Sequence, residues 1–395
     1  MSLPLLALFL AAFALGTAEF VIAGILPDVA AGLDISIPMA GYLITGYAIG
    51  IAVGGPLVAL ATKTVSRRSL ILVLCASFTA GQALCALAPN FELLMLARLF
   101  VAVMHGTFFG VAPIVATRLV PEDKRGSAVA LLLAGLTVSN ILGVPAGTAV
   151  GNAFGWRMSF WAVGLVGLLA TLFVAMVLPR TAEPPTGKGA FMREFKALGR
   201  QQIVLSLIIV VAVMIGQYSL FTFIAPLLRE VTGLAPEIVP WVLLLYGVGS
   251  TIGVFIGGRL ADWKLMPSLI VILALQAIVY ALIVPASTVP WVMACAVIAW
   301  GGINFAFGAP VQTRVLRWAA DAPNLASTLI PTAFNLGIAI GAVLGSSMLE
   351  AGFGYRDLPW IGTGTLVVAF IVAIVSLQIE KRLRQVPPTP LASPA

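Results

Sequence analysis

Three ionisable side chains, tyrosines aside, lie well inside long apolar stretches of this sequence: Glu19, Arg98 and His105. A charged side chain at the centre of a bilayer costs about 2.5 to 3.5 kcal/mol on insertion scales, so such residues usually pair or take part in transport. Glu19 precedes Pro27 by eight residues and Arg98 follows Glu92 by six, which is roughly 12 Å and 9 Å of helix. His105 lies two turns beyond Arg98 on the same face. If the two helices are neighbours, all three side chains can line one cavity.

These residue types suggest proton handling. A buried carboxylate near an arginine is subject to two opposed influences, the loss of water and the neighbouring cation, and their balance can let it bind and release a proton. Glu19 is therefore the candidate for proton coupling, and the alternative is a static ion pair with Arg98 that holds two helices together. Arg98 cannot deprotonate, so we expect it to serve as the partner of the acid. His105 titrates near neutrality in water, and it is either a relay or substrate contact, or a hydrogen-bonded packing residue.

The composition requires a lipid environment around these residues. Of 395 residues, 61% are hydrophobic and 9% are charged, against about 25% charged in an average soluble domain. One crossing of a bilayer takes about 20 apolar residues. We therefore predict an all-α membrane protein with twelve transmembrane helices, near residues 5–27, 39–60, 69–88, 92–115, 127–150, 158–178, 203–228, 239–260, 267–284, 291–313, 326–349 and 359–379.

The basic residues predict the orientation of the chain and its division into domains. Most of the 22 Lys and Arg residues fall on one side of the spans, among them Arg314 and Arg317 after the tenth. Basic loops stay in the cytoplasm, so both termini are predicted to be cytoplasmic. This spread of charge over six segments also argues against a nucleic-acid partner. The expected domains are an N-terminal bundle (1–178), a linker (179–202) with either a short interfacial helix near 191–198 or a plain loop, a C-terminal bundle (203–380) and a cytoplasmic tail (381–395).

The two halves of the sequence repeat each other at an offset of about 199 residues. Pro27 matches Pro226, and the tetrapeptide FGWR at 154–157 matches FGYR at 353–356. Such parallel repeats predict two pseudo-symmetric six-helix bundles with a substrate site between them near the midplane. The second half lacks the charges, since Glu19 corresponds to Tyr218.

We therefore expect the first bundle to handle protons and the second to supply most of an aromatic and amide wall for substrate. Ordinary core packing is the alternative for each wall residue. The candidates are Asn140, Gln217, Tyr218, Phe221, Tyr246, Trp300, Asn304 and Asn335.

Five segments of the sequence resemble the major facilitator superfamily, and within it the twelve-span drug:proton antiporter branch, close to the arabinose and sugar efflux permeases and chloramphenicol-efflux-like proteins. They are TAEFVIAGILPDVA at 17–30, AGYLITGYAIG at 40–50, LARLF around Arg98, HGTFFG at 105–110 and NILGVPAGTAVGNAFGWR at 140–157. The resemblance covers the whole chain. It implies the two-bundle fold of that superfamily, in which spans one and four are neighbours.

Glycine-containing motifs of the superfamily are partly retained. In the loop after span two, Gly55, Arg67 and Arg68 match the family motif, but Ala59 stands where the family has Asp. The second-half copy, which runs from Gly258 to Asp262, is intact. The resemblance implies that these residues form a cytoplasmic gate. Span five carries Gly143, Pro145 and Gly147, a weakened form of the antiporter motif, and small residues with proline permit close helix approach and bending.

Together these observations predict a secondary active exporter in the bacterial inner membrane that exchanges a proton for a small amphipathic solute such as a drug, sugar or metabolite. Export is implied by the resemblance; a uniporter or a proton symporter that imports solute is the alternative. An enzyme is not expected, since the chain has one His and no HExxH or GxSxG motif. We expect no cofactor, the proton gradient as energy source, and function as a monomer.

Overall fold

The computed structural model describes residues 2–62, 64–179, 200–319 and 323–385, with the backbone alone at 323–328 and 383–385. Within these ranges the chain is helical, and twelve helical segments are long and apolar enough to cross a membrane. The prediction of an all-α protein with twelve spans is confirmed. The proposed interfacial helix at 191–198 lies outside the described residues.

The first six spans are built from twelve elements. These are α1 (Leu3–Gly24), α2 (Leu26–Gly32), α3 (Ile37–Ile49), η1 (Gly50–Gly54), α4 (Gly55–Ala61), α5 (Arg67–Leu87), α6 (Phe91–Arg118), η2 (Glu122–Lys124), α7 (Arg125–Val138), η3 (Ser139–Gly143), α8 (Val144–Phe154) and α9 (Trp156–Val177).

The last six spans are built from eleven elements. These are α11 (Gln201–Phe221), α12 (Ile224–Pro226), η5 (Leu227–Val231), η6 (Pro236–Ile238), α13 (Val239–Trp263), α14 (Leu265–Ala286), α15 (Pro290–Ala306), α16 (Gly308–Trp318), α17 (Pro323–Glu350), η7 (Tyr355–Asp357) and α18 (Leu358–Gln385).

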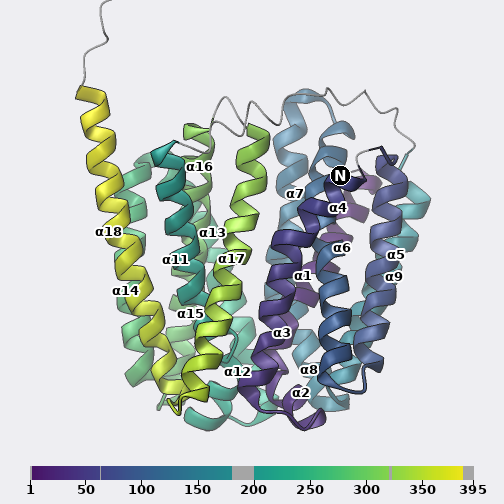
Figure 1. Ribbon diagram of the computed structural model, residues 1–395, viewed down its shortest axis with the longest axis horizontal. Coiled ribbons are helices and arrows are strands. Elements are labelled where there is room, and N and C mark those ends of the chain that lie inside the picture. The colour runs from purple at the N-terminus through teal and green to yellow at the C-terminus, as the bar shows by residue number, and fades with distance from the viewer. Residues whose placement is uncertain (1, 63, 180–199, 320–322, 386–395) are drawn as a thin grey trace, which may run out of the picture.

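The helices form two bundles that stand side by side (Figure 1). Helix α3 of the first bundle packs on α17 of the second, and α13 of the second packs on η3 and α8 of the first. Helix α1 begins and α18 ends at the same end of the molecule, which we call the terminal end. The opposite end, where α1 meets α2, is called the distal end. The outer surface carries large apolar side chains and exposed Trp241, Trp263 and Trp291 near helix ends, as expected for helices in lipid.

Equivalent turns at the distal end show the internal repeat in three dimensions. Arg157 donates from Nη2 to the carbonyl oxygen of Ala88 at 3.0 Å, and its counterpart Arg356 donates from Nε to the carbonyl oxygen of Val284 at 3.1 Å. In each half the arginine therefore ties the start of the last span to the end of the third. Each turn also contains a glycine at φ 90°, a conformation open mainly to glycine.

Two spans of the first bundle are interrupted by π-helical turns, η1 in the second span and η3 in the fifth. Pro56 and Pro145 lie directly after these turns. A proline has no N–H to donate to the carbonyl group four residues earlier, and its ring clashes with that group, so the local helix widens. The corresponding helices of the second bundle, α13 and α17, are uninterrupted in the described residues.

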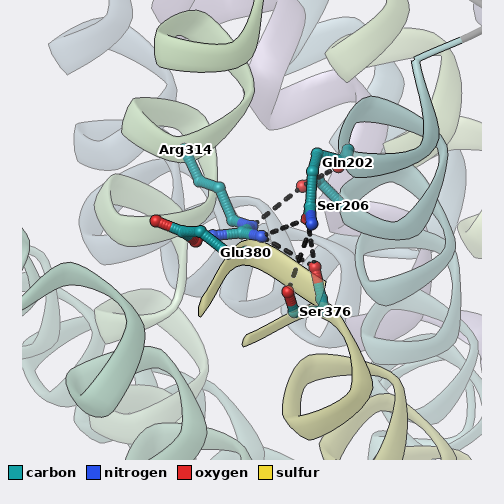
Figure 2. A network of polar contacts seen from close by, with 5 residues as sticks. All are labelled: Gln202, Ser206, Arg314, Ser376 and Glu380. Atoms are coloured by element: carbon teal, nitrogen blue, oxygen red, sulfur yellow. Dashed lines mark hydrogen bonds and ion pairs between the residues drawn. The ribbon is translucent and has the colours of Figure 1, made fainter. Parts of the chain in front are cut away.

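A buried polar network joins three helices at the terminal end of the second bundle (Figure 2). The Arg314 guanidinium donates from Nη1 to Glu380 at 3.1 Å, from Nη2 to Gln202 at 2.6 Å and to Ser376 at 2.7 Å, and from Nε to Ser206 at 3.2 Å. Only 1% of the Arg314 side chain is exposed. The sequence-based placement of Arg314 in a basic loop is therefore wrong, because α16 continues to Trp318 and turns this arginine into the bundle.

We expect Arg314→Ala to lower the free energy of unfolding by about 3 to 5 kcal/mol, because it removes the cation of a partly buried ion pair together with its hydrogen bonds. Arg317→Ala is the matched control, since Arg317 lies on the same helix and is exposed, and it should change stability by less than about 0.5 kcal/mol. Denaturant unfolding of the purified protein in detergent measures both. Equal midpoints for the two variants would contradict a stabilising role of the network.

Candidate functional site

The structure brings Glu19 of α1 close to His105 of α6. Glu19 Oε2 lies 3.7 Å from His105 Nε2, and the two side chains are 12% and 4% exposed. The other ring nitrogen of the histidine, Nδ1, lies 3.0 Å from the hydroxyl of Tyr47 on α3. The rings of Tyr47 and His105 meet edge to face, with centroids 5.8 Å apart. Three helices of the first bundle therefore contribute one side chain each to a continuous polar chain.

Arg98 lies beside these three polar side chains but does not form an ion pair with Glu19. Its Nε donates to the carbonyl oxygen of Leu43 at 3.3 Å and its Nη1 to that of Ala18 at 3.2 Å. The guanidinium also lies 4.4 Å from the centre of the Tyr47 ring, within the range of a cation–π contact. In the described part of the chain Arg98 forms no ion pair with a carboxylate. The static Glu19–Arg98 pair that the sequence allowed is thus not formed in this conformation, because backbone carbonyl groups and an aromatic face take the cation.

Glu19 opens into a cavity between the two bundles. The first bundle contributes the carboxylate together with aromatic and aliphatic side chains from α1 and α3, and the second contributes side chains from α11 and α17. The lining residues are Glu19, Phe20, Ala23, Ile44, Tyr47, Ala48, Tyr218, Phe221 and Ile338. The Phe20 and Tyr218 rings face each other across the bundles with centroids 6.5 Å apart. This cavity thus has one carboxylate in a mainly aromatic and aliphatic wall.

Of the residues predicted to bind substrate, Tyr218 and Phe221 line this cavity. Tyr246 lies behind Phe221, with ring centroids 5.2 Å apart, and Trp300 lies 5.0 Å from Tyr246. Gln217 donates to the Tyr246 hydroxyl at 3.0 Å. These three residues therefore support the wall from inside the second bundle.

The three predicted asparagines are each buried and each donate one hydrogen bond. Asn304 donates to the Tyr280 hydroxyl at 3.2 Å in the core of the second bundle. Asn140 donates to the carbonyl oxygen of Leu136 at 3.1 Å, and Asn335 donates to that of Pro331 at 3.0 Å. The Oδ1 atom of Asn335 is buried without a partner in the described part of the chain. None of the three belongs to the cavity lining.

The motif glycines of span five lie against α1. A Cβ atom on Gly143 would meet Thr17 Oγ1 at 2.0 Å, and one on Gly147 would meet Val21 Cγ2 at 2.6 Å. These glycines let the fifth span approach the helix that carries Glu19. Pro145 is the second residue of α8 and lies between them.

The loop-motif residues have separate positions. A Cβ atom on Gly55 would lie 2.7 Å from the backbone of Gly106, which brings the second span against α6. Arg68 donates to the carbonyl oxygen of Ala175 at 2.9 Å within the first bundle. In the second bundle, a Cβ atom on Gly258 would have no neighbour within 4 Å, and Asp262 is exposed. The gate expected at Arg67, Arg68, Gly258 and Asp262 remains a prediction.

The sequence analysis missed a polar contact that joins the bundles at the distal end. Arg229 in η5 donates from Nη1 and Nη2 to Asp28 at 3.1 and 2.8 Å, and from Nη2 to Asn152 at 3.0 Å. Asn152 also donates to the carbonyl oxygen of Pro236 at 2.6 Å. We call Asp28, Asn152 and Arg229 the distal clasp. The available signal was the repeat, because Asp28 and Arg229 follow the paired prolines at the ends of equivalent spans.

Metal binding finds no support in these side chains, since no group of three or more His, Cys, Asp or Glu residues suited to a metal ion occurs in the described ranges. The arrangement can instead hold a proton on the Glu19 carboxylate, which faces the cavity between the two bundles.

Comparisons with known proteins agree with this geometry. The family model described as Major Facilitator Superfamily matches residues 8–321. An Inner membrane transport protein YdhP of Escherichia coli is 39% identical over 94% of this chain and 95% of its own length. A Chloramphenicol resistance protein of Streptomyces lividans is 35% identical over 94% of this chain and 96% of its own. The crystal structure of a D-xylose-proton symporter superposes with a TM-score of 0.75 over 93% of this chain and 96% of its own at 15% identity, which shows a shared fold.

Arg98→Lys tests whether the guanidinium joins helices through its geometry. A lysine ammonium cannot donate to both carbonyl groups while lying flat on the Tyr47 ring, so we expect a loss of about 1 to 3 kcal/mol in unfolding free energy. Arg118→Lys, at the exposed end of the same helix, is the control and should leave stability unchanged. Denaturant unfolding in detergent compares them. An unchanged midpoint for Arg98→Lys would show that charge alone suffices.

Proposed function

The chain belongs to the Major Facilitator Superfamily and is a multi-pass membrane transporter, and we propose that it exports small amphipathic organic solutes in exchange for protons. In this proposal the two bundles rock about the cavity between them, so that it opens alternately to either side of the inner membrane. The proton gradient supplies the energy. Because the cavity lies within one chain, a monomer suffices for transport.

The observation that carries this proposal is the position of Glu19. It is the one carboxylate among the residues that line the cavity between the bundles, and no arginine or lysine pairs with it in the described part of the chain. A carboxylate fixed in an ion pair would resist protonation, whereas Glu19 faces a histidine nitrogen at 3.7 Å and the cavity. Its proton can therefore be exchanged when the cavity opens. Supporting evidence comes from the relatives, because one is called a chloramphenicol resistance protein.

Alternating access is supported by where the polar contacts between the bundles lie. The distal clasp and a hydrogen bond from Tyr42 to Glu350 at 3.4 Å join the bundles at the distal end. A Cβ atom on Gly41 would meet Phe223 and Ser346 of the second bundle at 2.7 Å, so the backbones also approach closely there. We infer that this conformation is closed at the distal end and that solute enters from the terminal end, which the basic loops predict to be cytoplasmic.

Glu19→Gln should abolish proton movement driven by solute, because an amide cannot bind and release a proton. The measurement uses proteoliposomes that contain a pH-sensitive dye, with chloramphenicol and a panel of small amphipathic drugs and sugars as probes. Glu122→Gln is the control, since that carboxylate is 84% exposed and pairs with Arg125 on the surface. Unimpaired proton movement in Glu19→Gln would refute the coupling role.

The same liposomes separate export from the alternative of uniport or import. Solute counterflow that proceeds without any proton movement in the wild-type protein would indicate a uniporter. Solute accumulation in the same direction as proton flow would indicate a symporter. The proposed exchange requires the two to move in opposite directions.

Asp28→Asn should favour opening of the distal end, because it removes the charged acceptor of Arg229. A loss of about 1 to 2 kcal/mol corresponds to a 5- to 30-fold change in a two-state population. Hydrogen-exchange mass spectrometry should then show faster exchange in α2 and η5. Asp34→Asn is the matched control, since Asp34 is exposed at the same end. Identical exchange in both variants would exclude the clasp as a determinant of the closed state.

A further inference from the structure

Tyr47 contacts His105 and Arg98 and lines the same cavity as Glu19, although the sequence pointed to it only as part of a family segment and of the internal repeat. Its hydroxyl lies 3.0 Å from His105 Nδ1, its ring lies under the Arg98 guanidinium at 4.4 Å, and it lines the cavity with Glu19. The side chain is 2% exposed. Arg98 is itself held by two backbone carbonyl groups, so the ring below it has little freedom to move. The position of the Tyr47 hydroxyl is therefore fixed from both sides.

Counting donors and acceptors selects one direction for the hydrogen bond between Tyr47 and His105. A phenol hydroxyl has one hydrogen to donate, and a neutral imidazole carries its proton on one nitrogen and accepts at the other. His105 Nδ1 is the polar partner that the described part of the chain offers to the Tyr47 hydroxyl. If Nδ1 donated instead, the phenol hydrogen would be buried without an acceptor, which costs about 1 to 3 kcal/mol. Tyr47 therefore donates and Nδ1 accepts.

We propose that Tyr47 is a positioning residue that fixes His105 in the tautomer with its proton on Nε2, aimed at Glu19. The inference rests on the proposed function for its meaning in transport, but the tautomer itself is a property of the resting protein. In this arrangement the imidazole turns its N–H toward the Glu19 carboxylate, whose Oε2 lies 3.7 Å from Nε2, just beyond hydrogen-bond distance. It cannot accept a second proton at Nδ1 until the Tyr47 hydroxyl turns away. His105 thus serves as a neutral donor, and the exchangeable proton stays on Glu19.

Among the residues that the structure describes, the groups around this cluster do not offer the imidazole another proton acceptor. The ionisable side chains that face it are Glu19 from α1, Arg98 from α6, Tyr218 across the cavity from α11, and Cys85 from α5 on the side of Arg98. The ring of Phe109 covers the histidine, with centroids 5.1 Å apart. The contacts of His105 are therefore the hydroxyl on one nitrogen, the carboxylate on the other and an aromatic face.

The duplicated half of the protein shows why this role is specific to Tyr47. Its counterpart at the offset of 199 is Tyr246, whose hydroxyl accepts a hydrogen bond from the Gln217 amide at 3.0 Å. An amide N–H has a fixed proton, so this tyrosine has no tautomer to select. In the bundle that carries Glu19, the tyrosine at this position contacts the imidazole of His105. In the other bundle, which has no acid at the position equivalent to Glu19, it contacts the amide of Gln217.

Nuclear magnetic resonance of ¹⁵N-labelled histidine tests the assignment directly. His105 is the only histidine in the chain, so protein that is purified without a polyhistidine tag and placed in lipid nanodiscs gives signals from one imidazole. We expect the neutral wild-type ring to carry its proton on Nε2. Tyr47→Phe keeps the ring under Arg98 and removes the hydroxyl. It should raise the population of forms protonated at Nδ1 by about tenfold.

Tyr280→Phe is the matched control, because it also removes a buried tyrosine hydroxyl, one that accepts from Asn304 in the second bundle. It should leave the imidazole spectrum unchanged. A wild-type spectrum with the proton on Nδ1 would overturn the proposal without any variant. An unchanged tautomer in folded Tyr47→Phe would also overturn it. A change of tautomer in Glu19→Gln but not in Tyr47→Phe would overturn it as well. Normal proton exchange in proteoliposomes with Glu19→Gln would refute the proposed function. The spectrum of the wild-type imidazole would still show the proton on Nε2, so the two failures can be told apart.

Discussion

The structure depends on one constraint. A carboxylate inside the membrane must be shielded from lipid and must still be able to gain and lose a proton. An acid in a low-dielectric interior is stabilised by a cation, by hydrogen bonds, or by taking up a proton. At Glu19 a carboxylate oxygen lies 3.7 Å from a histidine nitrogen. The arginine of the same cluster is engaged with the carbonyl oxygens of Ala18 and Leu43. The acid is thus surrounded by groups that tolerate both of its protonation states.

The two buried arginines illustrate two uses of the same side chain. Arg314 donates from all three of its nitrogens to side chains of two other helices, including the carboxylate of Glu380. Arg98 donates from two nitrogens to backbone oxygens, and its Nη2 has no partner in the described residues. A saturated network with a matched anion favours one rigid arrangement, whereas a cation with a spare donor can change partners at low cost. The first suits a bundle that moves as one body, and the second suits a site that changes state.

Depth counting placed Glu19 level with Arg98 and His105 two turns further along the same face, and the contact between spans one and four was implied by the family resemblance. It did not predict that Glu19 would approach His105 to 3.7 Å, because side-chain reach and the choice of partner depend on packing. The twelve spans followed from the apolar runs alone. Tyr47 was not assigned to the site because a tyrosine in an apolar run also suits an ordinary core position. The burial of Arg314 was missed because charge near a helix end usually indicates a loop. The Asp28–Arg229 contact depends on how two bundles meet, and no local pattern contains that information.

The pseudo-symmetric halves therefore differ in backbone as well as in charge. Pro56 and Pro145 each follow a π-helical turn in a span of the first bundle that packs on the second. Such turns weaken the regular ladder of backbone hydrogen bonds, and they often occur at functional sites. The second turn lies beside α1, where Gly143 meets Thr17 two residues before Glu19. The interrupted second and fifth spans and the buried acid thus belong to the same bundle. A movement of η3 or α8 would act on α1 directly, and the opposing helix α13, which has no such turn, would provide the surface against which it moves.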